Sequence, residues 1–111
     1  MNPDKESRVL SRIIGRITKT MAYCEGQTFE SFQSDDMLQE ACVFNVLQIG
    51  ELSHSELSEE FKKAHPEIAW REMYGLRNRI VHDYEGVNIR LVWEIIRDDI
   101  PELKQTIGEL L

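Results

Sequence analysis

The stretch MLQEACVFNVLQIGEL, residues 37–52, places apolar side chains over a wide arc of a helix rather than on one narrow face. We therefore expect this helix to be the most buried one in the protein. Its polar exceptions, Asn45, Gln48 and Glu51, follow one another at intervals of three. They either form one partly exposed edge or line a cleft or a contact between subunits. The wide apolar arc itself fits a central core helix and an intersubunit seam equally well.

The N-terminal segment predicts a second long helix, from an Asn2 cap with Pro3 at its first position to about Tyr23. Its apolar residues recur at helical spacing, and its basic residues fall within one arc on the opposite side. These basic residues are Lys5, Arg8, Arg12, Arg16 and Lys19. Such an arc is either the solvated face of an amphipathic helix or a surface that contacts phosphates.

Capping residues set the expected limits of two further elements. Residues 28–32 predict a connector whose two phenylalanines close one end of a bundle, and Ser34 or Asp35 caps the helix that follows. Ser55 or Ser58 caps a short acidic helix, which ends before a proline because the residue preceding proline disfavours helical geometry.

Two more helices complete the chain. One follows Pro66, and the other is capped by Asn88 and contains Pro101, which should kink or restart it. No segment shows the strict apolar and polar alternation of a strand. The sequence thus predicts an all-α fold, an antiparallel four-helix bundle with an additional short helix, in a single domain that spans residues 1–111.

The composition limits the class of protein. A chain of 111 residues with 41% hydrophobic and 30% charged residues suits one compact domain. No apolar run is long enough to span a membrane and the N-terminus lacks the apolar core of a signal peptide, so we expect a cytoplasmic protein without membrane contact. Cys24 and Cys42 lack metal-ligand spacing, and we expect reduced thiols in or near a core, with neither disulfide nor zinc.

The segment 75–84 concentrates chemically versatile side chains at the end of a helix that otherwise presents an apolar face. Ideal geometry places Arg77 near the apolar stripe, where a guanidinium needs an acidic partner, a bound anion or an interface. Asn78 and His82 are neighbours one helical turn apart, on a different face from Arg77. A joint role for Arg77 and His82 therefore requires Arg77 to reach across, the helix to unwind or a second subunit to complete the site.

The string Arg77-Asn-Arg-Ile-Val-His82-Asp-Tyr84 resembles the Arg-x-x-x-x-His-x-Tyr signature of the HEPN superfamily, and specifically the HepT-like toxins of prokaryotic toxin–antitoxin modules. Other segments are similar to the pattern of that family in the same order. They are residues 47–51, 68–70, 73–76, 92–94 and 100–103. The resemblance covers nearly the whole chain.

The resemblance implies a HEPN-like fold and a metal-independent endoribonuclease without a cofactor, which works as a homodimer with the motifs of both subunits facing one cleft. Arg77 and His82 correspond to the catalytic pair, and Asn78 supports it. Tyr84 matches the tyrosine to which a cognate nucleotidyltransferase antitoxin adds AMP units. Phosphates added beside the catalytic pair would repel RNA and occupy the arginine.

The RNA substrate that the resemblance implies, such as a tRNA or an mRNA, has to bind a chain with a net charge of −7. Such a charge argues against nucleic-acid binding through bulk electrostatics, so a local basic surface is required. Arg79 and Arg90 are candidate RNA contacts, together with the basic arc of the N-terminal helix.

Several alternatives stay open at this stage. The chain could be a non-catalytic subunit that presents nucleotides or substrates to a nucleotidyltransferase, or a simple helical dimerisation domain. Arg77 could form a structural ion pair with Glu51 or Glu72. His82 could cap the carbonyl groups at a helix C-terminus. The intact Arg77 and His82 pair favours the ribonuclease, because an adaptor needs no general base beside an arginine.

Overall fold

The computed structural model describes the backbone of residues 3–82 and 88–111 and the side chains of residues 5–80 and 88–111. All regular elements in these ranges are helical, which confirms the all-α prediction. None of the described helices is both long and apolar enough to cross a bilayer. In chain order the elements are α1 (Pro3–Cys24), α2 (Phe29–Gln33), α3 (Asp36–Ser55), α4 (Glu59–Ala64), α5 (Trp70–His82), α6 (Ile89–Glu94), a π-helical turn (Ile95–Asp99) and α7 (Ile100–Gly108).

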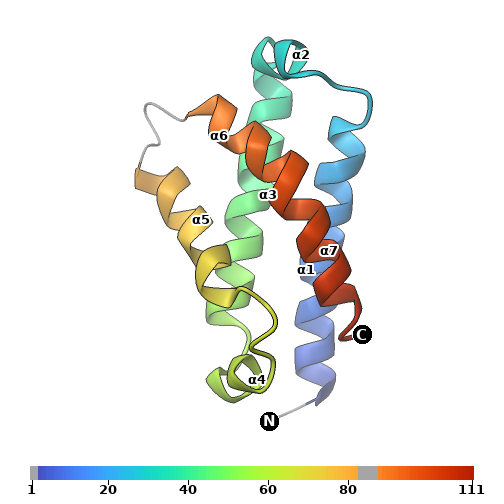
Figure 1. Ribbon diagram of the computed structural model, residues 1–111, viewed down its shortest axis with the longest axis vertical. Coiled ribbons are helices and arrows are strands. Elements are labelled where there is room, and N and C mark those ends of the chain that lie inside the picture. The colour runs from blue at the N-terminus through green and yellow to red at the C-terminus, as the bar shows by residue number, and fades with distance from the viewer. Residues whose placement is uncertain (1–2, 83–87) are drawn as a thin grey trace.

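Four long limbs form the bundle, and α3 lies between α1 and α5 and packs against both (Figure 1). The fourth limb, α6 to α7, passes over this layer and packs against α1 through α7. The completely buried side chains come from several limbs, such as Ile13 and Ile17 of α1 and Ile100 and Ile107 of α7. The apolar faces thus meet in one core.

Burial of α3 is less complete than its wide apolar arc predicts. Cys42, Val46 and Ile49 are buried, but Met37 is 83% exposed and Phe44 is 51% exposed. The helix has neighbours on the α1 and α5 sides, and its remaining side faces solvent in this single chain. The sequence therefore locates the central helix correctly, and an intersubunit seam on the exposed side of α3 stays a prediction.

The hydrogen bonds of the side-chain caps show which of two candidate residues begins α3 and which begins α4. The carboxylate of Asp35, rather than Ser34, accepts the backbone N–H of Leu38 at 3.0 Å and begins α3. Ser58, rather than Ser55, accepts the N–H of Phe61 at 3.0 Å and begins α4. Each cap satisfies a backbone donor that the first turn of a helix leaves without a partner.

In place of the connector expected at residues 28–32, the structure has a short helix, α2. Thr28 and Ser31 form a reciprocal capping box, with each side chain accepting from the backbone of the other. Phe32 is fully buried against Trp93, with ring centroids 5.1 Å apart. Phe29 is half-buried. The prediction that these phenylalanines close an end of the bundle is therefore correct, although the local structure was assigned wrongly.

The sequence predicts that Pro101 either kinks or restarts the last helix, and in the structure the α-helix restarts there. Proline has no N–H, so a normal α-helical bond is lost at this position. The backbone shifts into a π-helical turn, in which Ile100 donates its N–H to the carbonyl of Ile95, five residues earlier. Helix α7 then begins with Pro101 in its first turn.

Both cysteines lie in the core, as predicted. Cys24 ends α1 and Cys42 lies within α3, and their sulfur atoms are 3.5 Å apart in a buried hydrogen bond. This bond lowers the pKa of Cys24, while the same bond and burial raise the pKa of Cys42. Either thiol can donate in this bond, and the directions of the two pKa shifts make Cys24 the thiol that loses its proton first.

Candidate active site

Arg77 lies at a close approach between α3 and α5. A Cβ atom added to Gly50 of α3 would lie 2.6 Å from the Cβ of Arg77 and 3.1 Å from the carbonyl oxygen of Met73. Only glycine leaves enough room for the backbone of α5 at this point. The close approach fixes the base of the Arg77 side chain against α3.

The guanidinium of Arg77 is held on one side by two acceptors. Its Nε lies 3.3 Å from Oε2 of Glu51, and its Nη1 donates to Oδ1 of Asn78 at 3.0 Å. Ser55 donates to the other carboxylate oxygen of Glu51 at 2.9 Å. Of the two acidic partners considered from the sequence, Glu51 forms the pair and Glu72 does not. The Nη2 group of Arg77 has no partner among the described residues.

Two aromatic rings extend this group. The rings of His54 and Tyr74 stack with centroids 3.7 Å apart and planes 13° apart, and the guanidinium carbon of Arg77 lies 5.7 Å from the Tyr74 ring. We call Glu51, His54, Tyr74, Arg77 and Asn78 the Arg77 cluster. It combines a fixed cation with a partly exposed π-stacked pair, a combination suited to a phosphate and an adjoining base.

Neither His54 nor Tyr74 is among the candidate residues predicted from the sequence. A signal exists in their numbering. In two antiparallel helices, residues that face each other have a nearly constant sum of residue numbers, and Glu51 with Arg77 gives the same sum as His54 with Tyr74. Pairing α3 with α5 in this register would have found both contacts.

The other half of the predicted catalytic pair cannot be placed beside Arg77. His82 is the last residue of α5, and its side chain lies outside the described residues. Tyr84 also lies outside them. The joint role of Arg77 and His82 and the modification of Tyr84 therefore stay predictions.

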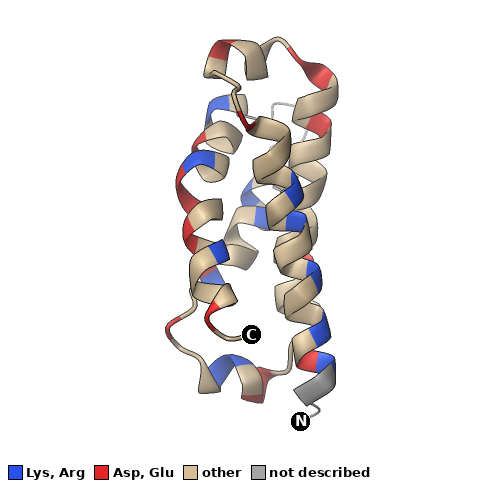
Figure 2. Cartoon of the chain, turned by 90° about the vertical axis from the view of Figure 1, so that its right-hand side faces the viewer, with Lys and Arg blue, Asp and Glu red and all other residues tan. Residues whose placement is uncertain are grey.

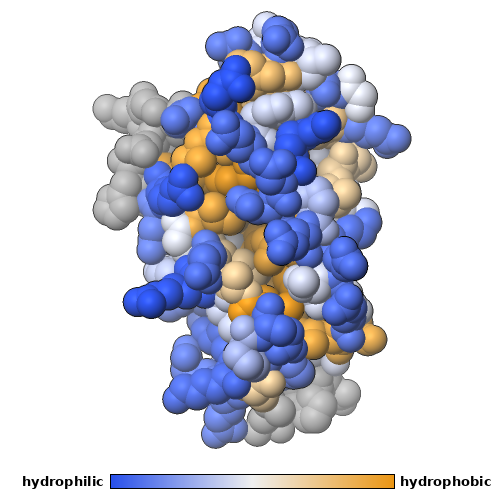
Figure 3. Space-filling model, in the orientation of Figure 1, coloured by the Kyte–Doolittle hydropathy of each residue, from blue (hydrophilic) through white to orange (hydrophobic). Residues whose placement is uncertain are grey.

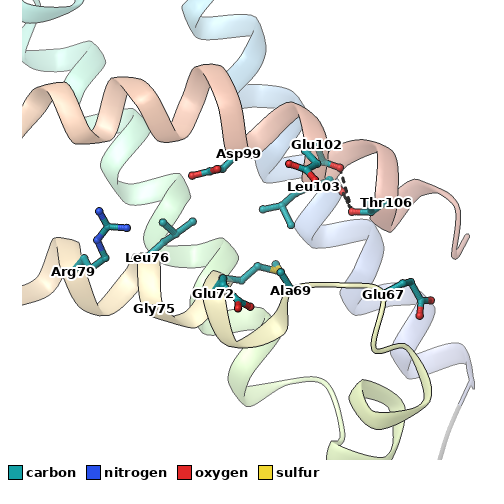
Figure 4. Close-up of a pocket in the computed structure, with 11 residues that line it drawn as sticks. Glu67, Ala69, Glu72, Gly75, Leu76, Arg79, Asp99, Glu102, Leu103 and Thr106 are labelled. Atoms are coloured by element: carbon teal, nitrogen blue, oxygen red, sulfur yellow. Dashed lines mark hydrogen bonds between the residues drawn. The ribbon is translucent and has the colours of Figure 1, made fainter.

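Arg79 and Arg90, the two candidate RNA contacts, do not join the Arg77 cluster. Arg90 covers the ring of Phe29 at 3.9 Å, at the end of the bundle formed by α2. Arg79 points toward the space between α5 and α7, where Asp99 lies across from it (Figure 4). The proposed contacts of Arg79 and Arg90 with RNA stay predictions.

The space between α5 and α7 is a groove of about 480 Å³ with an apolar floor that includes Met73, Leu76 and Leu103. Apolar side chains are visible in this central region of the surface in Figure 3. Its acidic lining residues are Glu67, Glu72, Asp99 and Glu102. Partial burial, followed by the nearby carboxylates of Asp98 and Glu102, raises the pKa of Asp99. This acidic groove would repel a polyanion. The Arg77 cluster is therefore the better candidate for a phosphate-binding site.

The polar residues of α3 do not form the single exposed edge or common lining considered from the sequence. Asn45 is buried and accepts a hydrogen bond from Arg16 of α1. Gln48 is half-buried between α1 and α3, and Glu51 is exposed beside α5. Asn45 and Gln48 thus face α1, whereas Glu51 faces α5.

No group of three His, Cys, Asp or Glu side chains that could hold a metal ion occurs in the part of the chain that the structure describes. The chemical resources of the Arg77 cluster are a permanent cation, an amide, a carboxylate and two aromatic rings.

Comparison with known proteins gives a consistent result. The family model described as ribonuclease HepT-like matches residues 13–110. A provisionally named RNase of Caldanaerobacter subterraneus subsp. tengcongensis is 39% identical over 87 residues, which are 78% of this chain and 77% of the relative. A protein of Thermococcus cleftensis named as a probable ribonuclease HepT is 42% identical over 76 residues, 68% of each chain. No solved structure matches this chain.

Proposed function

This chain belongs to the HepT-like ribonuclease family, and we propose that it is a metal-independent endoribonuclease that uses Arg77 and His82. In this proposal the protein is the toxin of a prokaryotic toxin–antitoxin module of type II or VII. It acts as a homodimer in the cytoplasm, and a cognate nucleotidyltransferase antitoxin neutralises it.

The observation that carries the proposal is the state of the Arg77 guanidinium. The Arg77 side chain is 32% exposed, and its guanidinium is fixed on one side by Glu51 and Asn78, with the Nη2 group without a partner among the described residues. A guanidinium held in this way is oriented before a ligand arrives, so little side-chain entropy is lost on binding. Its remaining donors suit the non-bridging oxygens of a phosphodiester as negative charge develops there.

The reaction that fits these residues needs no metal. The imidazole of His82 takes the proton of the RNA 2′-hydroxyl, and the 2′-oxygen attacks the adjacent phosphorus. The bond to the 5′-oxygen breaks, and the imidazolium formed in the first step returns its proton to that leaving oxygen. The products are a 2′,3′-cyclic phosphate and a 5′-hydroxyl end. Asn78, one helical turn before His82, holds the imidazole or a phosphate oxygen.

The central test is RNA cleavage in EDTA by Arg77→Ala and His82→Ala. Each should lower kcat at least about a hundredfold, the usual scale for losing an acid–base or charge-stabilising group. Arg71→Ala is the matched control, because Arg71 is an exposed arginine of the same helix with no place in the Arg77 cluster. A folded His82→Ala protein with normal cleavage would disprove the mechanism.

The homodimer is tested by mixing the two inactive variants. Ideal helical geometry separates Arg77 from His82 on α5, so the proposed cleft takes groups from two subunits. Exchange of subunits between Arg77→Ala and His82→Ala should restore part of the activity, since a mixed dimer keeps one intact arginine and one intact histidine in the cleft. Exchange that restores nothing would contradict a shared cleft.

Neutralisation by the antitoxin is proposed to occur through AMP addition to Tyr84. Coexpression with the neighbouring nucleotidyltransferase should increase the intact mass in steps of about 329 Da, and cleavage should be lost. Tyr84→Phe should keep both its mass and its activity. Loss of cleavage with unchanged mass would indicate inhibition by binding alone.

A second candidate function is a non-catalytic subunit that binds nucleotides or substrates for a nucleotidyltransferase. The ion pair between Arg77 and Glu51 favours it, because the carboxylate already neutralises the cation that catalysis requires. This candidate predicts nucleotide binding without RNA cleavage by the unmodified protein. Cleavage in EDTA that depends on His82 would exclude it.

A further inference from the structure

A second basic site lies between α1 and α3, away from the acidic groove. It is a hollow of about 160 Å³ lined by Arg12, Gly15, Arg16, Lys19, Gln48 and Leu52. Its lining contains three cations and no carboxylate. Figure 2 shows Lys and Arg residues along the outer side of α1 above the N-terminus. We call this feature the α1–α3 hollow.

No carboxylate of the described residues forms an ion pair with the cations of the hollow. Arg16 is half-buried, and its Nη1 donates at 3.2 Å to the side chain of Asn45, which is only 3% exposed. Its guanidinium also lies 5.2 Å from the Phe44 ring. Both partners are neutral, so they orient the cation without cancelling its charge. Arg12, Arg16 and Lys19 form no ion pair with any carboxylate in the described part of the chain.

Gly15 keeps the hollow open. It lies in the interior of α1 and is exposed, and a Cβ added there would meet no atom within 4 Å. A glycine inside a helix weakens the helix, and no close packing requires it here. At 100° per residue Gly15 shares one arc with Arg12, Arg16 and Lys19. The missing side chain leaves space for a ligand group among the three cations.

We propose that the α1–α3 hollow binds backbone phosphates of the RNA that Arg77 and His82 cleave. Gln48 lines the hollow, and Glu51, the partner of Arg77, lies one turn further along α3. The exposed side of α3 thus joins the three cations to the Arg77 cluster, with Phe44 as an exposed ring beside Arg16. This inference rests on the proposed ribonuclease function and identifies where its substrate is held outside the cleavage site.

The test measures binding separately from cleavage. A fluorescent single-stranded RNA with 2′-O-methyl groups cannot be cut through its 2′-oxygen, and its Kd is measured by anisotropy across a salt series with the full chain. Arg12→Gln and Lys19→Gln should each reduce the salt slope by about 0.7, which corresponds to about fivefold weaker binding at 0.1 M salt. Lys104→Gln, an exposed change of the same charge on α7, should leave the slope nearly unchanged.

A change that leaves the charge intact separates a shaped site from general attraction. Gly15→Leu should fill the hollow and weaken RNA binding about fivefold or more, although all three cations remain. Thr18→Leu is the control, since Thr18 is exposed on the same helix outside this arc. Equal binding by the Gly15→Leu and Thr18→Leu proteins would overturn the proposal, as would charge variants that behave like Lys104→Gln.

Two further outcomes identify the source of the phosphate. If the hollow variants lose affinity for ATP but keep their affinity for the RNA, the hollow is a mononucleotide site and the proposal is wrong. Cleavage is assayed in parallel on unmodified RNA. A loss of cleavage in Arg77→Ala far beyond its loss of RNA binding supports separate roles for the two sites. Weakened RNA binding in the hollow variants of a chain that never cleaves RNA would contradict only the proposed catalysis.

Discussion

The Nε of Arg77 lies 3.3 Å from Oε2 of Glu51, across the contact between α3 and α5. The carboxylate orients the guanidinium, but it also places a negative charge where a phosphodiester is proposed to bind. An exposed pair of this kind contributes about 1 kcal/mol or less to folding. The effect of Glu51 on substrate binding is therefore separable from its effect on stability.

Two substitutions of Glu51 should separate orientation from charge. Glu51→Gln keeps an oxygen that accepts from Arg77 and removes the charge, so KM for RNA should fall about two- to fivefold with kcat nearly unchanged. Glu51→Ala removes both, and the loss of orientation should lower kcat about tenfold. Steady-state cleavage kinetics provide the measurement. Identical kinetics for the two variants would contradict an orienting role.

Two glycines inside helices should respond to alanine with opposite signs. Gly50→Ala forces the new Cβ against Arg77 and the Met73 carbonyl and should destabilise the fold by about 1–3 kcal/mol. Gly75→Ala, on α5, meets no atom within 4 Å and should stabilise by about 0.5–1 kcal/mol through helix propensity. Urea unfolding measures both. A stable Gly50→Ala protein would show that α3 and α5 separate at little cost.

Local signals predicted the helices well, because caps and periodicity act within a few residues. Asp35, Ser58 and Asn88 each begin a helix at or beside the expected position. The five-residue α2 was missed because one turn provides too short an apolar pattern. The exposure of Phe44 was also missed, since it depends on which sides of α3 have neighbours.

The candidate site shows the same division between local and non-local information. The motif identified Arg77 and Asn78 from sequence alone, and Glu51 was one of two acidic partners considered. The stack of His54 on Tyr74 and the hydrogen bond from Arg16 to Asn45 depend on the register between helices far apart in the chain. Periodicity within one helix contains no information about that register.

The paired thiols should be protected from labelling in the native protein. In Cys24→Ala the remaining Cys42 lies inside α3 with 0% exposure and should react at least about a hundredfold more slowly than in the unfolded chain. In Cys42→Ala the remaining Cys24 ends α1 and is 5% exposed, so it should react faster than Cys42. Labelling with a thiol reagent at pH 8 measures both rates. Equal rates would mean that the end of α1 opens no more readily than the middle of α3.

Removing the negative charge of Asp99 from the acidic groove should stabilise the protein at neutral pH. The pKa of Asp99 is raised above its usual 3.8 by partial burial and by Asp98 and Glu102, so folding disfavours its ionised form. A carboxyl group with a raised folded pKa contributes its full stability below the unfolded pKa and loses it as the pH rises through the folded pKa. Asp99→Asn should therefore raise Tm at pH 7, and the gain should disappear below about pH 3.

The size of this gain is limited because Asp99 is largely exposed. We expect about 0.5 kcal/mol or less, which is about 2–4 °C in Tm for a chain of this size. Asp98→Asn is the matched control, since it removes the same charge from an exposed neighbour that does not line the groove. Its gain should be smaller, because the groove imposes a desolvation cost on Asp99 that its neighbour avoids. A gain for Asp99→Asn that persists unchanged at pH 3 would show that packing of the amide, rather than loss of the carboxylate charge, stabilises the variant.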